Sequence, residues 1–232
     1  STPQFGVVDL ALKEVIVEIP VPVKTLRNSP NLEQRLISDA VEAIQIETER
    51  VSLIGIGAKP TGSSGSQPAG IEVILPAAQR PNLKTNGDFM SFEELGKMKT
   101  ALRTRNIRDS DSQGYITSPA VGGYIENLRD GENRPLFREN MGAERYPMLL
   151  GKKYAETNMV PANRTVGTAN DTSLVFYGDW QYAVFGIGQD VEVAVDESVL
   201  RRTREVLIQV VAYVDFGVFY PEAFEMRGGV KF

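Results

Sequence analysis

The stretch from Val175 to Glu197 comes nearest in this chain to a ligand-binding pattern. Gly186 and Gly188 match the first half of a dinucleotide-binding loop, whose glycines let a pyrophosphate approach the backbone. That loop needs a third glycine at a strand-to-helix turn, but Val191 holds this position. Apolar residues alternate with polar ones from 191 to 195, which predicts another strand. A turn between two strands presents no helix N-terminus to a phosphate, so we predict no nucleotide site here.

Other residues that could carry chemistry lack a spacing that brings them together. Lys152 and Lys153 beside Tyr154 suggest an acid–base pair, but a charged turn is the better explanation. Asp109–Gly114 matches the first half of a calcium loop, yet Ala120 replaces the bidentate glutamate, and we expect a polar turn. The candidates for a carboxylate pair of a glycoside hydrolase are Asp179, Asp190 and Glu192. Nothing in their spacing brings two of them together, so we do not expect such a pair.

The composition removes most catalytic chemistry, because the chain has no cysteine and no histidine. Disulfides, thiolate nucleophiles, imidazole metal ligands and Ser-His-Asp catalysis are excluded. The Gly/Ser/Pro-rich stretch from Gly55 to Gly70 lacks the lysine of a phosphate-cradling loop and is expected to be a surface loop. We therefore predict no catalytic residues, no cofactor-binding residues and no metal site, and we expect that the protein is not an enzyme.

The net charge of −5 argues against sequence-specific nucleic-acid binding, which needs a basic face. The longest basic runs are only Arg201-Arg202 and Lys152-Lys153. No apolar run approaches the roughly 20 residues that span a bilayer, so no membrane partner is expected. The chain starts without methionine or a secretory signal, and we expect a processed or trimmed product.

Residues 10–26 alternate between apolar and polar positions, which predicts a strand. Its apolar face carries Val15, Val17, Ile19, Val21 and Val23, and its polar face carries Glu14, Glu18 and Lys24. Pro20 and Pro22 share the polar side. Because proline cannot donate to a ladder, we expect an edge strand or a two-stranded ribbon.

The next segment predicts a long amphipathic helix that ends before Gly55. Ser29 is its expected N-cap, with Pro30 at the first helical position. Apolar residues then recur at every fourth position, namely Leu32, Leu36, Ala40 and Ile44. A second helix is expected after Ser91, where Glu94 would complete a capping box.

The remaining pattern is mostly β structure. A short strand is expected at Tyr115–Thr117, then a helix that starts after Ser118-Pro119 and ends near Asp130-Gly131. Alternate residues from Val206 to Val218 are all apolar, which predicts one strand of about 13 to 15 residues and about 45 Å. Such a strand suits a long, flat plate. These elements indicate an α+β protein with a structural or assembly role.

The order of these segments resembles the major capsid protein of tailed bacteriophages, of the Hong Kong 97 type. "SPNLEQRLISDAVEAIQIETERVSLIGIG" is similar to the spine helix and glycine-rich loop of that family. "GYITSPAVGGYIENLRDGENRPLF" is similar to its strand and Pro-started helix. "YPMLLGKKYAETNMVP" resembles a further family segment, and Gly178, Asp179, Trp180 and Tyr182 match its Gly-Asp-aromatic strand pair. "TREVLIQVVAYVDFGVFYPEAFEMRG" resembles the closing long strand.

The resemblance implies a capsid fold with a spine helix, a long peripheral-domain sheet and an axial domain. Residues 1–26 would be a remnant of the extended loop and N-terminal strand, and residues 27–50 with 199–218 the peripheral domain. Residues 51–198 with 219–232 would form the axial domain. The chain would begin near or inside the extended loop, as an excerpt of the mature subunit. Some members of that family join subunits by a Lys–Asn isopeptide bond. No such bond is expected here, because no asparagine follows Asn170. Arg204 or its neighbours stand where the asparagine would be sought on the long strand.

The implied function is a structural head protein that self-assembles into pentamers and hexamers of an icosahedral shell around double-stranded DNA. A scaffolding segment, a maturation protease and a portal are its implied partners, with assembly in the host cytoplasm and a final place in the virion. An encapsulin-type nanocompartment shell is the alternative, followed by a nucleotide-binding enzyme. Candidate inter-subunit residues are Arg138, Glu139, Glu144, Arg145, Arg201, Arg202 and Arg204.

Overall fold

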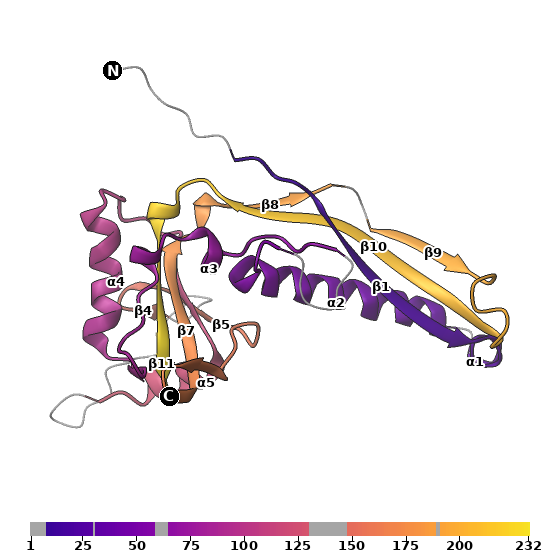
Figure 1. The fold of residues 1–232 in the computed structure, drawn as a ribbon, viewed down its shortest axis with the longest axis horizontal. Helices are drawn as coiled ribbons and strands as arrows, with labels where there is room; N and C mark the ends of the chain where they lie inside the picture. The colour runs from indigo at the N-terminus through magenta and orange to yellow at the C-terminus, as the bar shows by residue number, and fades with distance from the viewer. Residues whose placement is uncertain (1–7, 30, 59–64, 130–147, 189–190) are drawn as a thin grey trace, which may run out of the picture. The chain divides into compact units, whose positions relative to one another are not determined.

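The computed structural model describes residues 8–29, 31–58, 65–129, 148–188 and 191–232 (Figure 1). The chain divides into two compact units. We call Val8–Gly70 with Phe185–Gly217 the long-strand unit, and Ile71–Val184 with Val218–Phe232 the seven-strand unit. The long-strand unit includes residues 51–70 and 185–198, which the predicted domains place with the axial domain. Within the described ranges, no helix is long and apolar enough to cross a membrane.

A four-stranded sheet dominates the long-strand unit, in the order β1-β10-β8, with β9 also paired to β10. Its strands are β1 (Lys13–Pro22), β8 (Ala183–Ile187), β9 (Glu192–Asp196) and β10 (Glu205–Val218). The β1–β10 pair is antiparallel, from Lys13 opposite Val214 to Pro22 opposite Glu205. The 14-residue β10 confirms the predicted long strand. β1 lies at the sheet edge, as its prolines predicted.

Two helices follow β1, where one was expected. Pro22 ends the strand, and Val23–Asn28 form α1 rather than continuing the alternation. The Val23 amide donates to the Arg204 carbonyl (3.1 Å), which holds α1 against the turn before β10. The long helix α2 spans Leu32–Ile54 and has Asn31 at its N-cap, so the prediction of Ser29 as the cap is wrong. Its end before Gly55 is confirmed.

The core of the long-strand unit lies between α2 and the sheet (Figure 1). Ala40 and Ile44 of α2 pack in one buried cluster with residues of β1 and β10, namely Val21, Ile208, Val210 and Ala212. These strand residues share one face, because side chains alternate along a strand. The predicted apolar faces of the helix and of both strands are therefore the faces that meet.

The seven-strand unit contains a mixed sheet in the order β2-β11-β7-β3-β5-β4, with β6 paired to β7. Its strands are β2 (Asp88–Phe89), β3 (Gln113–Thr117), β4 (Met148–Leu149), β5 (Lys152–Glu156), β6 (Arg164–Val166), β7 (Ala169–Asp179) and β11 (Phe224–Lys231). The β3–β5 and β2–β11 pairs are parallel, and the other pairs are antiparallel. From Thr172 to Asp179, β7 is buried between β11 and β3.

The helices of this unit supply the other half of its core. They are α3 (Ile71–Ile74), α4 (Phe92–Thr104) and α5 (Pro119–Glu126), with 3-10 turns η1 (Ala77–Gln79), η2 (Trp180–Tyr182) and η3 (Pro221–Ala223). Apolar side chains of α4 and α5 pack in one buried cluster with those of β3, β5, β7 and β11. Ser91 caps α4 by accepting from the Glu94 amide (3.2 Å), as predicted. α5 stops at Glu126, earlier than expected, and the predicted end at Asp130-Gly131 lies outside the described residues.

Burial of α2 can be tested with two isoleucines two positions apart. Ile44 is 5% exposed inside the core, whereas Ile46 is 44% exposed on the same helix. We expect Ile44→Ala to lower the free energy of unfolding by about 2–5 kcal/mol, because it removes buried methylenes and leaves a cavity. Ile46→Ala should change it by about 0.5 kcal/mol. Denaturant unfolding of both variants checks this, and equal effects would contradict the described packing.

Candidate functional site

The glycines of the Val175–Glu197 stretch make room for side chains rather than for a ligand. A Cβ on Gly178 would lie 2.1 Å from the ring of Phe224, which faces it across the β7–β11 pair. That ring packs edge-on against Trp180, with centroids 5.5 Å apart. A Cβ on Gly188 would lie 2.6 Å from Leu12. Strand β9 follows β8, so the strand predicted after Gly188 is confirmed.

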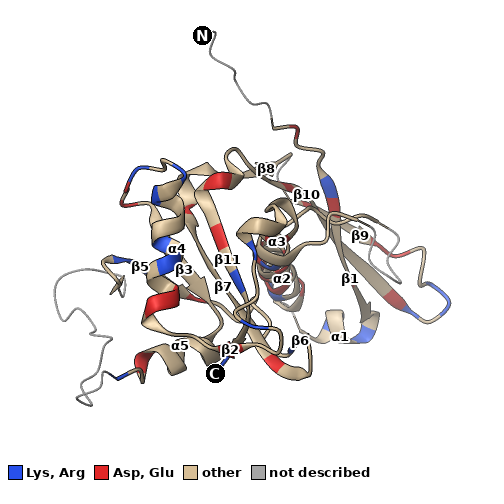
Figure 2. Cartoon of the chain, turned by 60° about the vertical axis from the view of Figure 1, so that its left-hand side comes forward, with Lys and Arg blue, Asp and Glu red and all other residues tan. Residues whose placement is uncertain are grey.

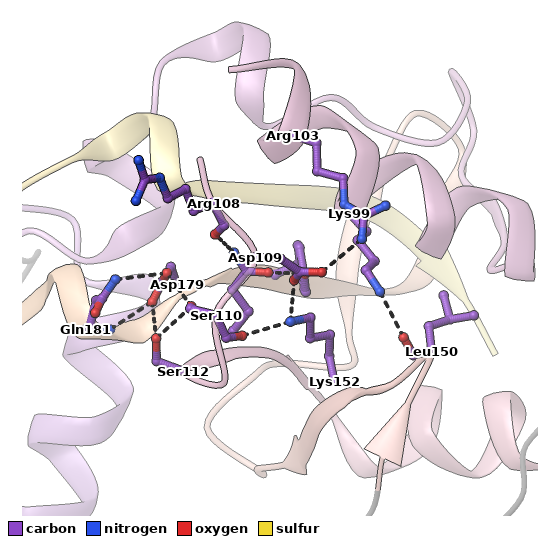
Figure 3. A network of polar contacts seen from close by, with 12 residues as sticks. Lys99, Arg103, Arg108, Asp109, Ser110, Ser112, Leu150, Lys152, Asp179 and Gln181 are labelled. Carbon is purple, nitrogen blue, oxygen red and sulfur yellow. Dashed lines mark hydrogen bonds and ion pairs between the residues drawn. The ribbon is translucent and has the colours of Figure 1, made fainter. Parts of the chain in front are cut away.

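Asp179, at the end of β7, is buried and is the centre of a polar network (Figure 3). Its carboxylate accepts hydrogen bonds from the hydroxyls of Ser110 (2.6 Å) and Ser112, and from the side-chain amide of Gln181 (3.1 Å). The Trp180 amide donates to the Ser112 carbonyl (3.2 Å). A buried carboxylate is tolerated where several donors compensate its desolvation. The network therefore fastens the loop before β3 to the end of β7.

Asp109 belongs to the same loop and forms ion pairs with Lys152 of β5 and with Arg103 of α4 (2.9 Å) (Figure 3). The hydrogen bond from Lys152, joined by that from Arg103, holds the pKa of the Asp109 carboxyl below its usual range. These pairs stabilise the fold above the unfolded-state pKa of about 3.9, and the contribution is lost as pH falls through the folded-state pKa. Because the Asp109 side chain is 47% exposed, solvent screening keeps the contribution small.

Lys152 corrects one sequence-based expectation, because it is buried in strand β5 rather than solvated in a charged turn. Its ammonium also donates to the Ser110 carbonyl (2.8 Å). Two residues on, the Tyr154 hydroxyl donates to Glu156 (2.8 Å), and burial raises the pKa of Tyr154 well above its ordinary value. Both groups are engaged inside the fold, so this arrangement positions strands and offers no acid–base pair to a substrate.

A second buried charge cluster ties β11 to α4. Glu225 is 3% exposed and forms ion pairs with Arg105 and with Arg227. Arg227 also approaches Glu94 of α4 (3.7 Å). Removing one member of such a cluster leaves a buried charge uncompensated, which is costlier than losing a surface pair. These residues lie far apart in sequence, and no periodicity indicated that they meet.

The three candidate carboxylates of the sequence fall in different parts of the chain. Asp179 belongs to the seven-strand unit and Glu192 to the long-strand unit, while Asp190 lies outside the described residues. Among the residues that the structure describes, no group of three carboxylates could hold a metal ion.

A hollow of about 760 Å³ lies between α2, β1, residues 65–68 and the end of β10. Its arginine, Arg50, is paired with Glu47 (2.5 Å) and Gln67 (3.1 Å).

The predicted inter-subunit residues fall into two groups. Four lie outside the described residues, namely Arg138, Glu139, Glu144 and Arg145. The others, Arg201, Arg202 and Arg204, are exposed in the turn between β9 and β10 (Figure 2). Lys24 and Arg27 of α1 are also exposed and join them at this end of the sheet, where the Val23–Arg204 hydrogen bond links the two segments. Sequence alternation missed this grouping because it placed Lys24 on a strand.

Comparison with known proteins identifies the architecture. The model of the phage capsid family matches residues 1–226. The chain belongs to the phage capsid family. No curated protein matches the chain. This family membership, together with the mixed helix-and-sheet architecture, confirms the α+β, Hong Kong 97-type fold and makes the chain a structural capsid protein. Its place is the virion capsid, and membership in a capsid family supports self-association.

Solved structures of low sequence identity share the fold. The capsid of a native GTA particle, computed with C5 symmetry, is 15% identical with a TM-score of 0.73, covering 99% of this chain and 76% of that chain. A chain in the structure of Gordonia phage Cozz is 16% identical to this chain with a TM-score of 0.66, and the match covers 98% of this chain and 78% of that chain. The holo-SrpI encapsulin complex from Synechococcus elongatus PCC 7942 is 12% identical with a TM-score of 0.67, covering 95% and 74%.

The Asp179 network can be tested against a second aspartate on the same strand. Asp179 is 1% exposed, whereas Asp171 is an exposed residue of β7. We expect Asp179→Ala to lower the free energy of unfolding by about 1–3 kcal/mol, because it removes the charged acceptor of two half-buried serine hydroxyls. Asp171→Ala should change it by about 0.5 kcal/mol. If chemical denaturation found the two variants equally stable, the network would not hold the loop.

Proposed function

We propose that this chain assembles with copies of itself into pentamers and hexamers that tile an icosahedral shell around double-stranded DNA. The observation that carries the proposal is the capsid-family match over residues 1–226. Copies that meet head to tail around an axis close into rings, because a heterologous contact with the right rotation returns to its start. Many weak contacts per subunit then give a stable shell, since each neighbour is held at high effective concentration.

The two compact units suggest how the roles are divided. In the proposal, the long-strand unit is the peripheral domain, with α2 as the spine helix and β1 as part of the extended loop. The seven-strand unit is the axial domain, which points to the centre of each ring. The segment with Arg138, Glu139, Glu144 and Arg145 would then lie at the capsomer axis. Burial of α2 against the long strand supports this assignment.

The charge of the chain supports a container rather than a nucleic-acid condenser. A net charge of −5 leaves little attraction for phosphates, and DNA pumped into a shell by a motor need not be bound by the wall. In the proposal, a scaffolding segment, a maturation protease and a portal act during assembly in the host cytoplasm.

An encapsulin-type nanocompartment is the second candidate, because the holo-SrpI encapsulin complex has the same fold with a TM-score of 0.67. The two candidates differ in what the shell holds. A phage shell encloses DNA, whereas a nanocompartment encloses cargo protein, and a cargo enzyme encoded beside the gene would favour the second. The capsid-family match favours the first.

Assembly can be measured directly on the chain expressed alone. We expect light scattering and cryo-electron microscopy to find rings of five and six subunits or closed shells. A monomer at every accessible protein concentration would contradict the proposal. Shells purified from cells that also carry the neighbouring genes should contain nuclease-protected DNA. A stoichiometric cargo protein in place of DNA would replace the phage shell with the nanocompartment.

A further inference from the structure

Among the described residues of the long-strand unit, no helix covers one of the two faces of the four-stranded sheet. α2 packs against one set of alternate residues, which includes Val17 of β1 and Val210 of β10. The residues between them point to the opposite side, which we call the outer face. Glu14, Ile16 and Glu18 of β1 lie there and are exposed. The register adds Glu192 of β9, because Val211 lies opposite both Ile16 and Glu192.

The outer face is acidic around an apolar centre. Glu18 accepts from the side-chain amide of Gln209 (2.6 Å), and Glu14 accepts from the Tyr213 hydroxyl (3.3 Å). Both partners are neutral, and within the described residues no ion pair involves Glu14, Glu18 or Glu192. Ile16, between the two glutamates of β1, is 48% exposed. The face therefore presents negative charge that no described residue of the same chain neutralises in an ion pair.

The opposite charge is gathered at one end of the same sheet. We call this the basic tip, and it consists of Lys24, Arg27, Arg201, Arg202 and Arg204 (Figure 2). All are exposed, and none pairs with a carboxylate among the residues that the structure describes. The tip also has an apolar element, because Val199 in its turn is 64% exposed. Asp196, beside it, is occupied by hydrogen bonds from Ser198 and Val199 of the same turn.

We propose that the basic tip of one copy docks on the outer face of the next copy, with Val199 packed against Ile16 and the arginines beside Glu14, Glu18 and Glu192. The occupant is a second copy of this chain, and the inference rests on the proposed self-assembly. Each surface is a charged rim around an exposed aliphatic side chain, and the two charges are opposite. Single exposed ion pairs contribute little, but complementary patches fix the register of an encounter and exclude wrong partners.

In the proposal this contact is heterologous. The basic tip adjoins the Pro22–Glu205 end of the β1–β10 pair, whereas Glu18 lies opposite Gln209, about 13 Å further along the strands. One copy therefore uses its end and the next copy uses the middle of its sheet. Such a contact leaves one tip and one face free in every pair, so it propagates or closes into a ring.

The absence of cysteine permits a direct test by disulfide trapping of the full chain. The variant with both Ile16→Cys and Val199→Cys should form covalent species larger than a dimer on mild oxidation. Each single variant can form no covalent species beyond a dimer, which makes it the matched control. If the double variant also stops at dimers, the proposed contact is wrong, even when wild-type shells form. Covalent oligomers without wild-type shells would instead support the contact and contradict the proposed function.

Charge reversal in the double-cysteine background tests the electrostatic part. We expect Arg201→Glu with Arg202→Glu to abolish the species larger than a dimer, and the charge-conserving Arg201→Lys with Arg202→Lys to retain them. Adding Glu18→Arg and Glu192→Arg to the glutamate variant should restore them, because both signs are then exchanged. Circular dichroism of each variant establishes that it is folded. Oligomers that survive the reversal, or a lack of rescue in folded protein, would overturn the proposal.

Discussion

The structure of the long-strand unit depends on the burial of one face of α2 against β1 and β10. A 23-residue helix with charged residues on its other faces is stabilised mainly by the apolar face that it buries. Each large aliphatic side chain that leaves water contributes about 1.5–3 kcal/mol. The same packing requires β10 to present its alternate apolar residues to the helix. Its 14-residue length is unusual for a small domain and lets it pair with β1, β8 and β9.

Buried and exposed polar groups play different parts, and both suit a shell subunit. In the seven-strand unit, Asp179, Lys152 and Glu225 are buried and engaged, and they join loops and helices to the sheet. In the long-strand unit, Glu14 and Arg201 belong to charged surfaces that are exposed. Internal networks make a subunit rigid, whereas exposed complementary charge is available for contacts between subunits. A structural protein needs both and has no need of a reactive centre.

Periodicity in the sequence predicted the elements that bury one regular face. The apolar residues of α2 recur with the helical period, and those of β10 alternate, so both elements were found with nearly correct bounds. The N-cap of α4 was found because it is local, with Ser91 accepting from the Glu94 amide. Pro20 and Pro22 correctly indicated an edge strand, since the missing amide is a property of the residue itself.

Features that depend on distant partners could not be predicted in this way. Lys152 looked like a turn residue because its partner, Asp109, lies in another part of the sequence. α1 was missed because the alternation of β1 continues past Pro22, while the Val23 amide bonds to the Arg204 carbonyl. The inclusion of residues 51–70 in the long-strand unit likewise depends on backbone contacts, such as Gly70 N–H to Gly55 O (2.8 Å), that no local pattern encodes.

The most direct test of this account is a measurement of methyl–methyl nuclear Overhauser effects in the unassembled chain with labelled alanine, isoleucine and valine methyl groups. The described packing predicts cross-peaks that connect Ala40 and Ile44 of α2 with methyl groups of Ile208, Val210 and Ala212 of β10. Such cross-peaks would establish the helix-on-strand plate on which the capsid interpretation depends. Cross-peaks from α2 that remain within the helix, with none to β10, would contradict it.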